Sequence, residues 1–151
     1  MRNMLMSAAI AAATLFGATV ADFHLGASTI TPVFSEPRAK LVVTLVYLPS
    51  NNYNCPWVKT AGHGKGSEVT QRTPEGHWPD NFTSRVPICG AEGLQFHKNS
   101  DDGYDLIQND GVHVGSCFRN FGGDGLNCPG FPFYMWKVFE NYVCYSYLCN
   151  P

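Results

Sequence analysis

Beyond its first 21 residues this sequence lacks an apolar run long enough to cross a membrane, and it lacks clusters of one charge. Ten Lys and Arg residues oppose twelve Asp and Glu residues in 151, and the basic residues are scattered singly. Nucleic-acid binding through phosphate neutralisation needs a basic patch, and so does a cationic membrane-disrupting peptide. We therefore expect no nucleic acid among the partners and no membrane insertion.

Motifs for metal-dependent or serine-nucleophile catalysis are also missing. The sequence contains no C-x-x-C, no H-E-x-x-H and no G-x-S-x-G. Asp101, Asp102, Asp105 and Asp110 offer oxygen ligands for Ca²⁺, but their spacing does not match an EF-hand loop, and turn chemistry explains them. We therefore expect no metal, no cofactor and no catalytic residues.

The N-terminus has the pattern of a secretory signal peptide. Arg2 is followed by an uncharged apolar stretch from Met4 to Val20, and the small residues Thr19 and Ala21 suit a cleavage site. Cleavage there would begin the mature chain at Asp22. The sequence thus predicts a signal peptide at residues 1–21, one secreted domain at residues 22–151, and an extracellular location.

All cysteines lie in the predicted mature part, and an even number in a short secreted chain indicates a disulfide framework. The six are Cys55, Cys89, Cys117, Cys128, Cys144 and Cys149.

The spacing of the last two cysteines limits how they pair. Five extended steps from Cys144 to Cys149 cover about 16 Å, well beyond the roughly 7 Å that bridged Cα atoms allow. We expect these two not to pair with each other. Cys117 and Cys128 flank a Gly-rich turn and are expected to close a loop, which would leave Cys144 and Cys149 to bind Cys55 and Cys89.

The remaining pattern is that of strands and turns. Residues Phe23–Thr31 and Leu41–Leu48 predict partner strands, and residues 49–80 predict an irregular loop with one short strand near Glu68–Arg72. Asp-Gly turns at 102–103 and 110–111 divide Leu94–Arg119 into a β-meander, because Asp and Gly tolerate the positive φ of tight hairpins.

The C-terminal aromatic stretch predicts a final hairpin. Its strands are expected at Phe133–Phe139 and Tyr142–Leu148, with the turn at Glu140 and Asn141. The predicted fold is therefore all-β: a single small disulfide-stapled sandwich or barrel-like domain built from hairpins and a meander.

Two tryptophans are the most suggestive candidates for ligand binding. Trp57 and Trp78 lie in predicted loops beside prolines, where rigid exposed rings can stack on sugars or on a partner. Asn81-Phe82-Thr83 is an N-glycosylation sequon, and we expect Asn81 to be modified.

A small secreted ribonuclease is a further alternative. Glu75, His77 and Arg72 form a Glu/His/Arg trio that would suit general acid–base cleavage of RNA. These residues lie in a Gly- and Pro-rich loop, whereas small fungal ribonucleases hold such groups on separate strands.

Several short motifs together resemble small secreted cysteine-rich proteins of filamentous ascomycete fungi. They are D-F-H-L-G (22–26), I-C-G (88–90), G-L-Q-F (93–96), D-G-Y-D (102–105), N-D-G (109–111), G-S-C-F (115–118), C-P-G (128–130) and V-C-Y-S-Y-L-C (143–149). The resemblance implies a fungal origin and a role as a candidate effector. Its motifs are turns and cystines, which specify no chemistry.

The function expected from the sequence is a non-enzymatic secreted interaction protein, a monomer that binds a host or extracellular protein or glycan. The disulfide frame would resist proteases, and loops 49–80 and 119–133 would present the contact surface. A secreted carbohydrate-binding, lectin-like module is the first alternative, and the ribonuclease is the second.

Overall fold

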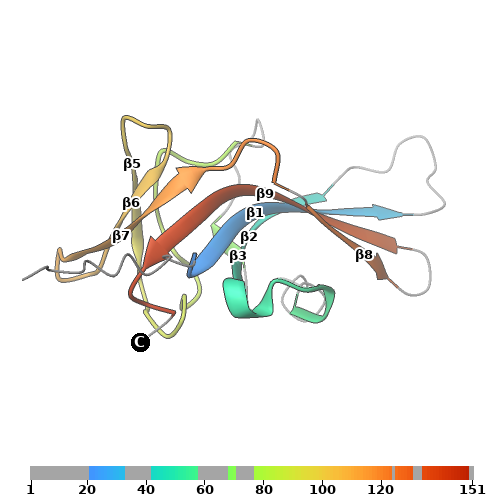
Figure 1. The fold of residues 1–151 in the computed structure, drawn as a ribbon, viewed down its shortest axis with the longest axis horizontal. Helices are drawn as coiled ribbons and strands as arrows, with labels where there is room; N and C mark the ends of the chain where they lie inside the picture. Colours follow the sequence, from blue (N-terminus) through green and yellow to red (C-terminus); the bar gives the residue numbers. More distant parts are fainter. Residues whose placement is uncertain are drawn as a thin grey trace, which may run out of the picture.

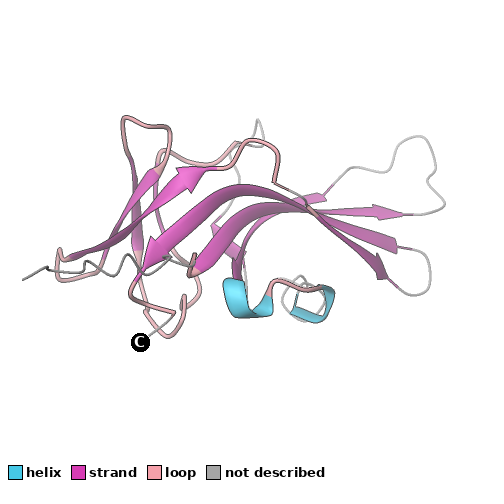
Figure 2. Ribbon diagram, viewed as in Figure 1, coloured by secondary structure: helices cyan, strands magenta, loops and turns pink. Residues whose placement is uncertain are grey.

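The protein is all-β, as the sequence predicts (Figures 1 and 2). The structure, a computed structural model, describes residues 21–32, 42–57, 68–70, 77–123, 125–130 and 134–149. Its elements are β1 (Phe23–Pro32), β2 (Val42–Pro49), the 3-10 helix η1 (Ser50–Asn52), β3 (Glu68–Thr70), β4 (Asn81–Thr83), β5 (Gln95–Lys98), β6 (Tyr104–Ile107), β7 (His113–Arg119), β8 (Leu126–Gly130) and β9 (Tyr134–Ser146).

The strands form one antiparallel sheet that curls into a nearly closed barrel. Their order is β3-β2-β1-β9-β7-β6-β5-β4, and β8 pairs with β9 outside this path. The two edges meet just beyond β3 and β4, where the Arg85 amide donates to the Val69 carbonyl at 2.9 Å. The Arg85 guanidinium also lies 3.5 Å from the Glu68 carboxylate. Of the two predicted architectures, the structure therefore has the barrel.

The N-terminal strand pair and the meander are confirmed. β1 pairs with β2 from Phe23↔Pro49 to Ile30↔Val42, and β5, β6 and β7 pair in sequence order. Asp102 and Gly111 have φ values of 56° and 84°, the left-handed conformation for which these turn residues are suited. The short strand expected near residue 68 is β3.

The predicted C-terminal hairpin is wrong, because β9 runs through residues 140 and 141 as one strand. β1 pairs with β9 along its whole length. Gly26 lies opposite Glu140 and Leu25 lies opposite Tyr142, so Asn141 is an extra residue in a β-bulge. The other edge of β9 is shared: β8 pairs with its first half and β7 with its second. The break in the sequence pattern at 140–141 thus marks a bulge.

The predicted Cys117–Cys128 disulfide is also wrong. Cys117 is bonded to Cys144 and Cys128 to Cys55, while Cys89 is bonded to Cys149. The reason is topological: Cys117 and Cys144 are directly opposed on β7 and β9, whereas β8 carries Cys128 to the other half of β9. That Cys144 and Cys149 do not pair with each other is confirmed.

Two buried clusters stabilise the sheet. The larger fills the barrel and consists of Phe23, Leu25, Leu45, Tyr47, Val69, Ile88, Leu94, Phe96, Tyr104, Leu106, Cys117, Tyr142 and Cys144. The second lies on the opposite face of β2, where residues 53–57 cover Val46, Leu48, Cys128, Trp136 and Val138. Alternate residues of β2 serve the two clusters, which explains why this strand is apolar on both faces.

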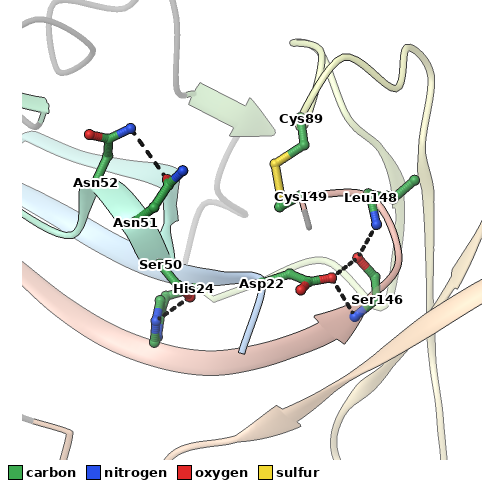
Figure 3. The surroundings of a disulfide bond; sticks show 9 residues. All are labelled: Asp22, His24, Ser50, Asn51, Asn52, Cys89, Ser146, Leu148 and Cys149. Atoms are coloured by element: carbon green, nitrogen blue, oxygen red, sulfur yellow. Dashed lines mark hydrogen bonds between the residues drawn. A yellow bond between two sulfur atoms is a disulfide. The ribbon is translucent and has the colours of Figure 1, made fainter. Parts of the chain in front are cut away.

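The beginning and the end of the described chain are joined (Figure 3). The Asp22 carboxylate accepts hydrogen bonds from the Ser146 amide at 2.8 Å and from its hydroxyl at 2.6 Å. Ser146 Oγ in turn accepts from the Leu148 amide, and Cys149 is bonded to Cys89. The C-terminal turn is therefore fixed at Ser146 by hydrogen bonds to Asp22 and at Cys149 by the disulfide.

Some expectations fall on residues that the structure does not describe. The predicted signal peptide, apart from Ala21, and Arg72 and Glu75 lie outside the described residues. In the part that is described, no helix is long and apolar enough to span a bilayer. Three disulfides in a small domain are compatible with an extracellular location.

Candidate functional site

A pocket of about 400 Å³ opens where the meander and the second half of β9 meet the loop before β4. We call it the Trp78 pocket. It is lined by Ala27, His77, Trp78, Asp80, Lys98, Arg119, Asn141 and Tyr142.

The β-bulge of β9 supplies one wall of the Trp78 pocket. Asn141, the extra residue of the bulge, accepts a hydrogen bond on its side-chain oxygen from the Trp78 indole N–H at 3.1 Å. Its carbonyl accepts from the Asn120 amide at 2.8 Å, which fixes the backbone there. Bulges often re-aim a side chain toward a site, and here the bulge joins the sheet to the loop of Trp78.

An aromatic cluster forms the base of the pocket. The Trp78 ring lies edge-on to Tyr142, with centroids 5.8 Å apart, and Tyr142 lies edge-on to Tyr104 at 5.1 Å. The buried Tyr104 hydroxyl donates to the Pro79 carbonyl at 2.7 Å and so anchors the loop that carries Trp78. Burial raises the Tyr104 pKa, and this phenol therefore stays a neutral donor.

Charged side chains form the rim. Lys98 and Arg119, at the ends of β5 and β7, share the Asp102 carboxylate: Lys98 Nζ lies 2.8 Å from Oδ1, and Arg119 donates to Oδ2. Lys98 also lies 3.8 Å from Asp80. The hydrogen bonds from Lys98 and Arg119 lower the pKa of Asp102, and the same bonds raise the pKa values of both bases. All three groups are therefore charged at neutral pH.

The structure separates the two tryptophans predicted to bind a ligand. Trp78 lines the pocket and is half-buried. Trp57 instead packs between the two buried clusters, edge-on to Tyr47 at 5.9 Å, and its indole N–H donates to the Tyr47 carbonyl at 3.4 Å. Of the two tryptophans, Trp78 lines the pocket and Trp57 does not.

Of the residues proposed for the ribonuclease alternative, the structure describes only His77, and it places His77 at the pocket. Sequence reasoning missed Lys98, Arg119 and Asn141. Lys98 and Arg119 are the last residues of two strands in the predicted meander. Because alternate strands of a meander end at the same side of the sheet, the sequence could have predicted that these two cations lie close together. Asn141 carried no such signal because the bulge depends on pairing with β1.

A second polar group links His24, Ser50 and Glu140 on the other face of the sheet. Ser50 Oγ lies 3.1 Å from His24 Nε2 (Figure 3), and His24 Nδ1 lies 3.1 Å from Glu140 Oε2. The order resembles a hydrolytic triad, but the ring N–H is not aligned for the hydrogen bond that orients a catalytic histidine. We interpret the group as a link between β1, η1 and β9.

Metal binding has no geometric support within the described ranges. There, no three His, Cys, Asp or Glu side chains are grouped so that they could hold an ion. The acidic residues of the meander act in turns: the Asp110 carboxylate accepts from the Val112 amide at 3.0 Å, and Asp102 pairs with the two rim cations.

The predicted glycosylation site lies on the edge strand β4. Asn81 and Thr83 are exposed, while Phe82 between them points inward and stacks on Phe96 at 4.5 Å. Both sequon side chains are therefore accessible from one face. We expect protein secreted by a eukaryotic host to lose apparent mass on treatment with an N-glycosidase. Asn81→Gln should abolish this shift and Thr83→Ser should keep it; a shift that persists in Asn81→Gln would contradict the assignment.

No protein-family model matches this sequence, and no curated protein or solved structure matches it either.

Proposed function

We propose that this chain is a secreted, non-enzymatic interaction protein that recognises the carbohydrate of an extracellular target at the Trp78 pocket. This proposal combines the two hypotheses drawn from the sequence, an interaction protein and a lectin-like module, and assigns the binding to a single pocket. The observation that carries it is the composition of the pocket: an indole and a phenol at the base, with amide, carboxylate and basic groups around them.

This combination suits a sugar better than an apolar ligand. A saccharide ring has an apolar face that packs on aromatic rings and a rim of hydroxyls that donate and accept hydrogen bonds. Trp78 supplies the ring, while Asp80, Asn141 and Lys98 supply the polar groups from three different segments. The indole is also held in place by Asn141, so little side-chain entropy is lost on binding.

The remaining parts of the proposal rest on the sequence. The signal-peptide pattern and the six cysteines support secretion, and the resemblance to fungal cysteine-rich proteins supports an effector that acts on a host surface. The paired cysteines support the same view, because a cross-linked barrel persists among extracellular proteases.

Ribonuclease activity is the second candidate, and one observation favours it. His77, whose imidazole can transfer a proton, shares the pocket with Lys98 and Arg119, whose cationic groups can hold a phosphate. An acid–base pair needs a second residue, and Glu75, the expected partner, lies outside the described residues. Cleavage of RNA by the pure protein, lost in His77→Ala, would favour this candidate over the binding proposal.

The binding proposal is tested with a glycan array and with titrations of its hits. We expect Trp78→Ala to weaken binding by at least about tenfold, because a ring of this size at the centre of a site contributes 1.4 kcal/mol or more. Trp78→Phe keeps the packing on Tyr142 and should bind with intermediate affinity.

The control for this test is Tyr147→Ala. Tyr147 is 86 % exposed and does not line the pocket, so its loss should leave sugar binding unchanged. Circular dichroism would show that each variant is folded. An array without signal, or equal binding by folded Trp78→Ala and the unchanged protein, would overturn the proposal.

A further inference from the structure

The Trp78 pocket presents two basic groups that share a single hydrogen-bonded carboxylate. Asp102 lies in the turn between β5 and β6, and it contacts Lys98 through one oxygen and Arg119 through the other. The two cations are thereby held side by side at one end of the sheet. Asp102 positions both of them but compensates only one unit of positive charge.

The second carboxylate near this pair is held loosely. Asp80 lies 3.8 Å from Lys98, beyond hydrogen-bond distance, and its side chain is 81 % exposed. An exposed ion pair of this kind is worth little, so Asp80 is free to turn toward a ligand. The guanidinium of Arg119 has five N–H donors in a planar fork, and one of its terminal nitrogens donates to Asp102.

We infer that the Trp78 pocket binds an acidic saccharide, a sugar whose carboxylate lies against Arg119 and Lys98 while its ring packs on Trp78. This inference rests on the proposed carbohydrate-binding function and narrows it to one chemical class. A carboxylate matches the guanidinium fork and can form two parallel hydrogen bonds with it. It also adds a directly hydrogen-bonded anion beside Asp102, because the other nearby carboxylate, Asp80, lies 3.8 Å from Lys98 and is exposed.

The lining favours a carboxylated sugar over a phosphate. Asp80 is an acceptor at the rim and needs a donor from the ligand, which the hydroxyls of a sugar provide. Free phosphate near neutral pH carries more negative charge than a carboxylate and has few donors, so Asp80 repels it more strongly than it repels a sugar acid, whose hydroxyls can donate to Asp80. Free phosphate also has no apolar face, so it does not explain why an indole lies at the base of the pocket.

The experiment compares acidic sugars with matched neutral ones by isothermal titration of the oxidised protein, expressed from the full chain in a secreting eukaryotic host. The probes are tri-galacturonate against its methyl ester, and sialyllactose against its methyl ester. Each pair differs in the negative charge while keeping most of the sugar surface. We expect at least one acid to bind about tenfold more tightly than its neutral counterpart, a preference that falls as salt is raised.

Variants of the basic pair assign the preference to the pocket. Arg119→Gln and Lys98→Gln should each reduce the preference for the acid while changing the affinity for the neutral sugar much less. Arg119→Lys keeps the charge and loses the fork, so it should recover only part of the preference. Lys137→Gln is the matched control, because Lys137 is an exposed cation of β9 that packs over Phe139 outside the pocket.

The outcomes separate this inference from the function on which it rests. Equal affinity for acids and their neutral counterparts, with binding that still depends on Trp78, would overturn the acidic ligand and leave carbohydrate binding standing. Competition by inorganic phosphate alone, with no sugar bound, would overturn both and identify a simple anion site. A preference for the acid that survives Arg119→Gln and Lys98→Gln would also contradict the inference, because other residues would then bind the carboxylate of the sugar.

Discussion

Replacing Cys117 and Cys144 together by alanine is expected to lower the free energy of unfolding by about 4–5 kcal/mol. The bond joins residues 27 apart, and closing such a loop in the unfolded chain accounts for about 3.6 kcal/mol. Both residues are also fully buried in the barrel, so removing two sulfur atoms leaves a cavity.

The control for this prediction is the Cys89→Ala/Cys149→Ala double variant. Its cysteines are 60 residues apart, and loop closure alone therefore predicts a slightly larger loss, about 4.3 kcal/mol. These two residues are only partly buried, so we expect no added cavity cost. Urea titrations of all three oxidised proteins measure the difference. A larger loss for the Cys89 and Cys149 pair would show that chain entropy outweighs packing in this barrel.

Truncating Tyr104 is expected to cost about 3–5 kcal/mol and to weaken ligand binding as well. Tyr104 is fully buried, and its ring contacts Phe82, Phe96 and Tyr142, with centroids 5.5, 6.1 and 5.1 Å away. Tyr104→Ala would remove the centre of this aromatic cluster. Thermal unfolding followed by circular dichroism measures the loss.

Tyr104→Phe separates packing from hydrogen bonding. It keeps the ring but removes the hydroxyl that donates to the Pro79 carbonyl, at a cost of about 1–2 kcal/mol. Because that bond anchors the loop carrying Trp78, we expect Tyr104→Phe to remain folded and to bind the pocket's ligand more weakly. Unchanged binding by this variant would mean that the other contacts of the loop, such as the Trp78–Asn141 bond, suffice to position Trp78.

The sequence was most informative where structure is local. β-branched and aromatic alternation placed β1, β2 and the meander, and Asp-Gly pairs placed two of its turns, because those features depend on neighbouring residues. Trp78 and His77 were recognised as candidates from residue type and loop context. The impossibility of a Cys144–Cys149 bond followed from chain geometry alone.

The errors arose where distant segments decide the outcome. Residues 140–141 looked like a turn because the alternation breaks there, but a long pairing with β1 makes β9 one strand and turns the break into a bulge. The Gly-rich segment after Cys117 looked like a loop closed by its own cysteines. Pairing of β7 and β8 with different halves of β9 instead carries Cys117 and Cys128 to different partners.

The sequence by itself therefore determined the all-β class, the cross-linked character and most strand positions, because alternation, turn residues and cysteine number are written along the chain. Only the tertiary structure decided the disulfide pairing and the pocket. Ala27, Trp78, Lys98, Arg119 and Asn141 come from five separate segments. Their proximity depends on sheet order and on one bulge, and these follow from long-range strand pairing that no local pattern encodes.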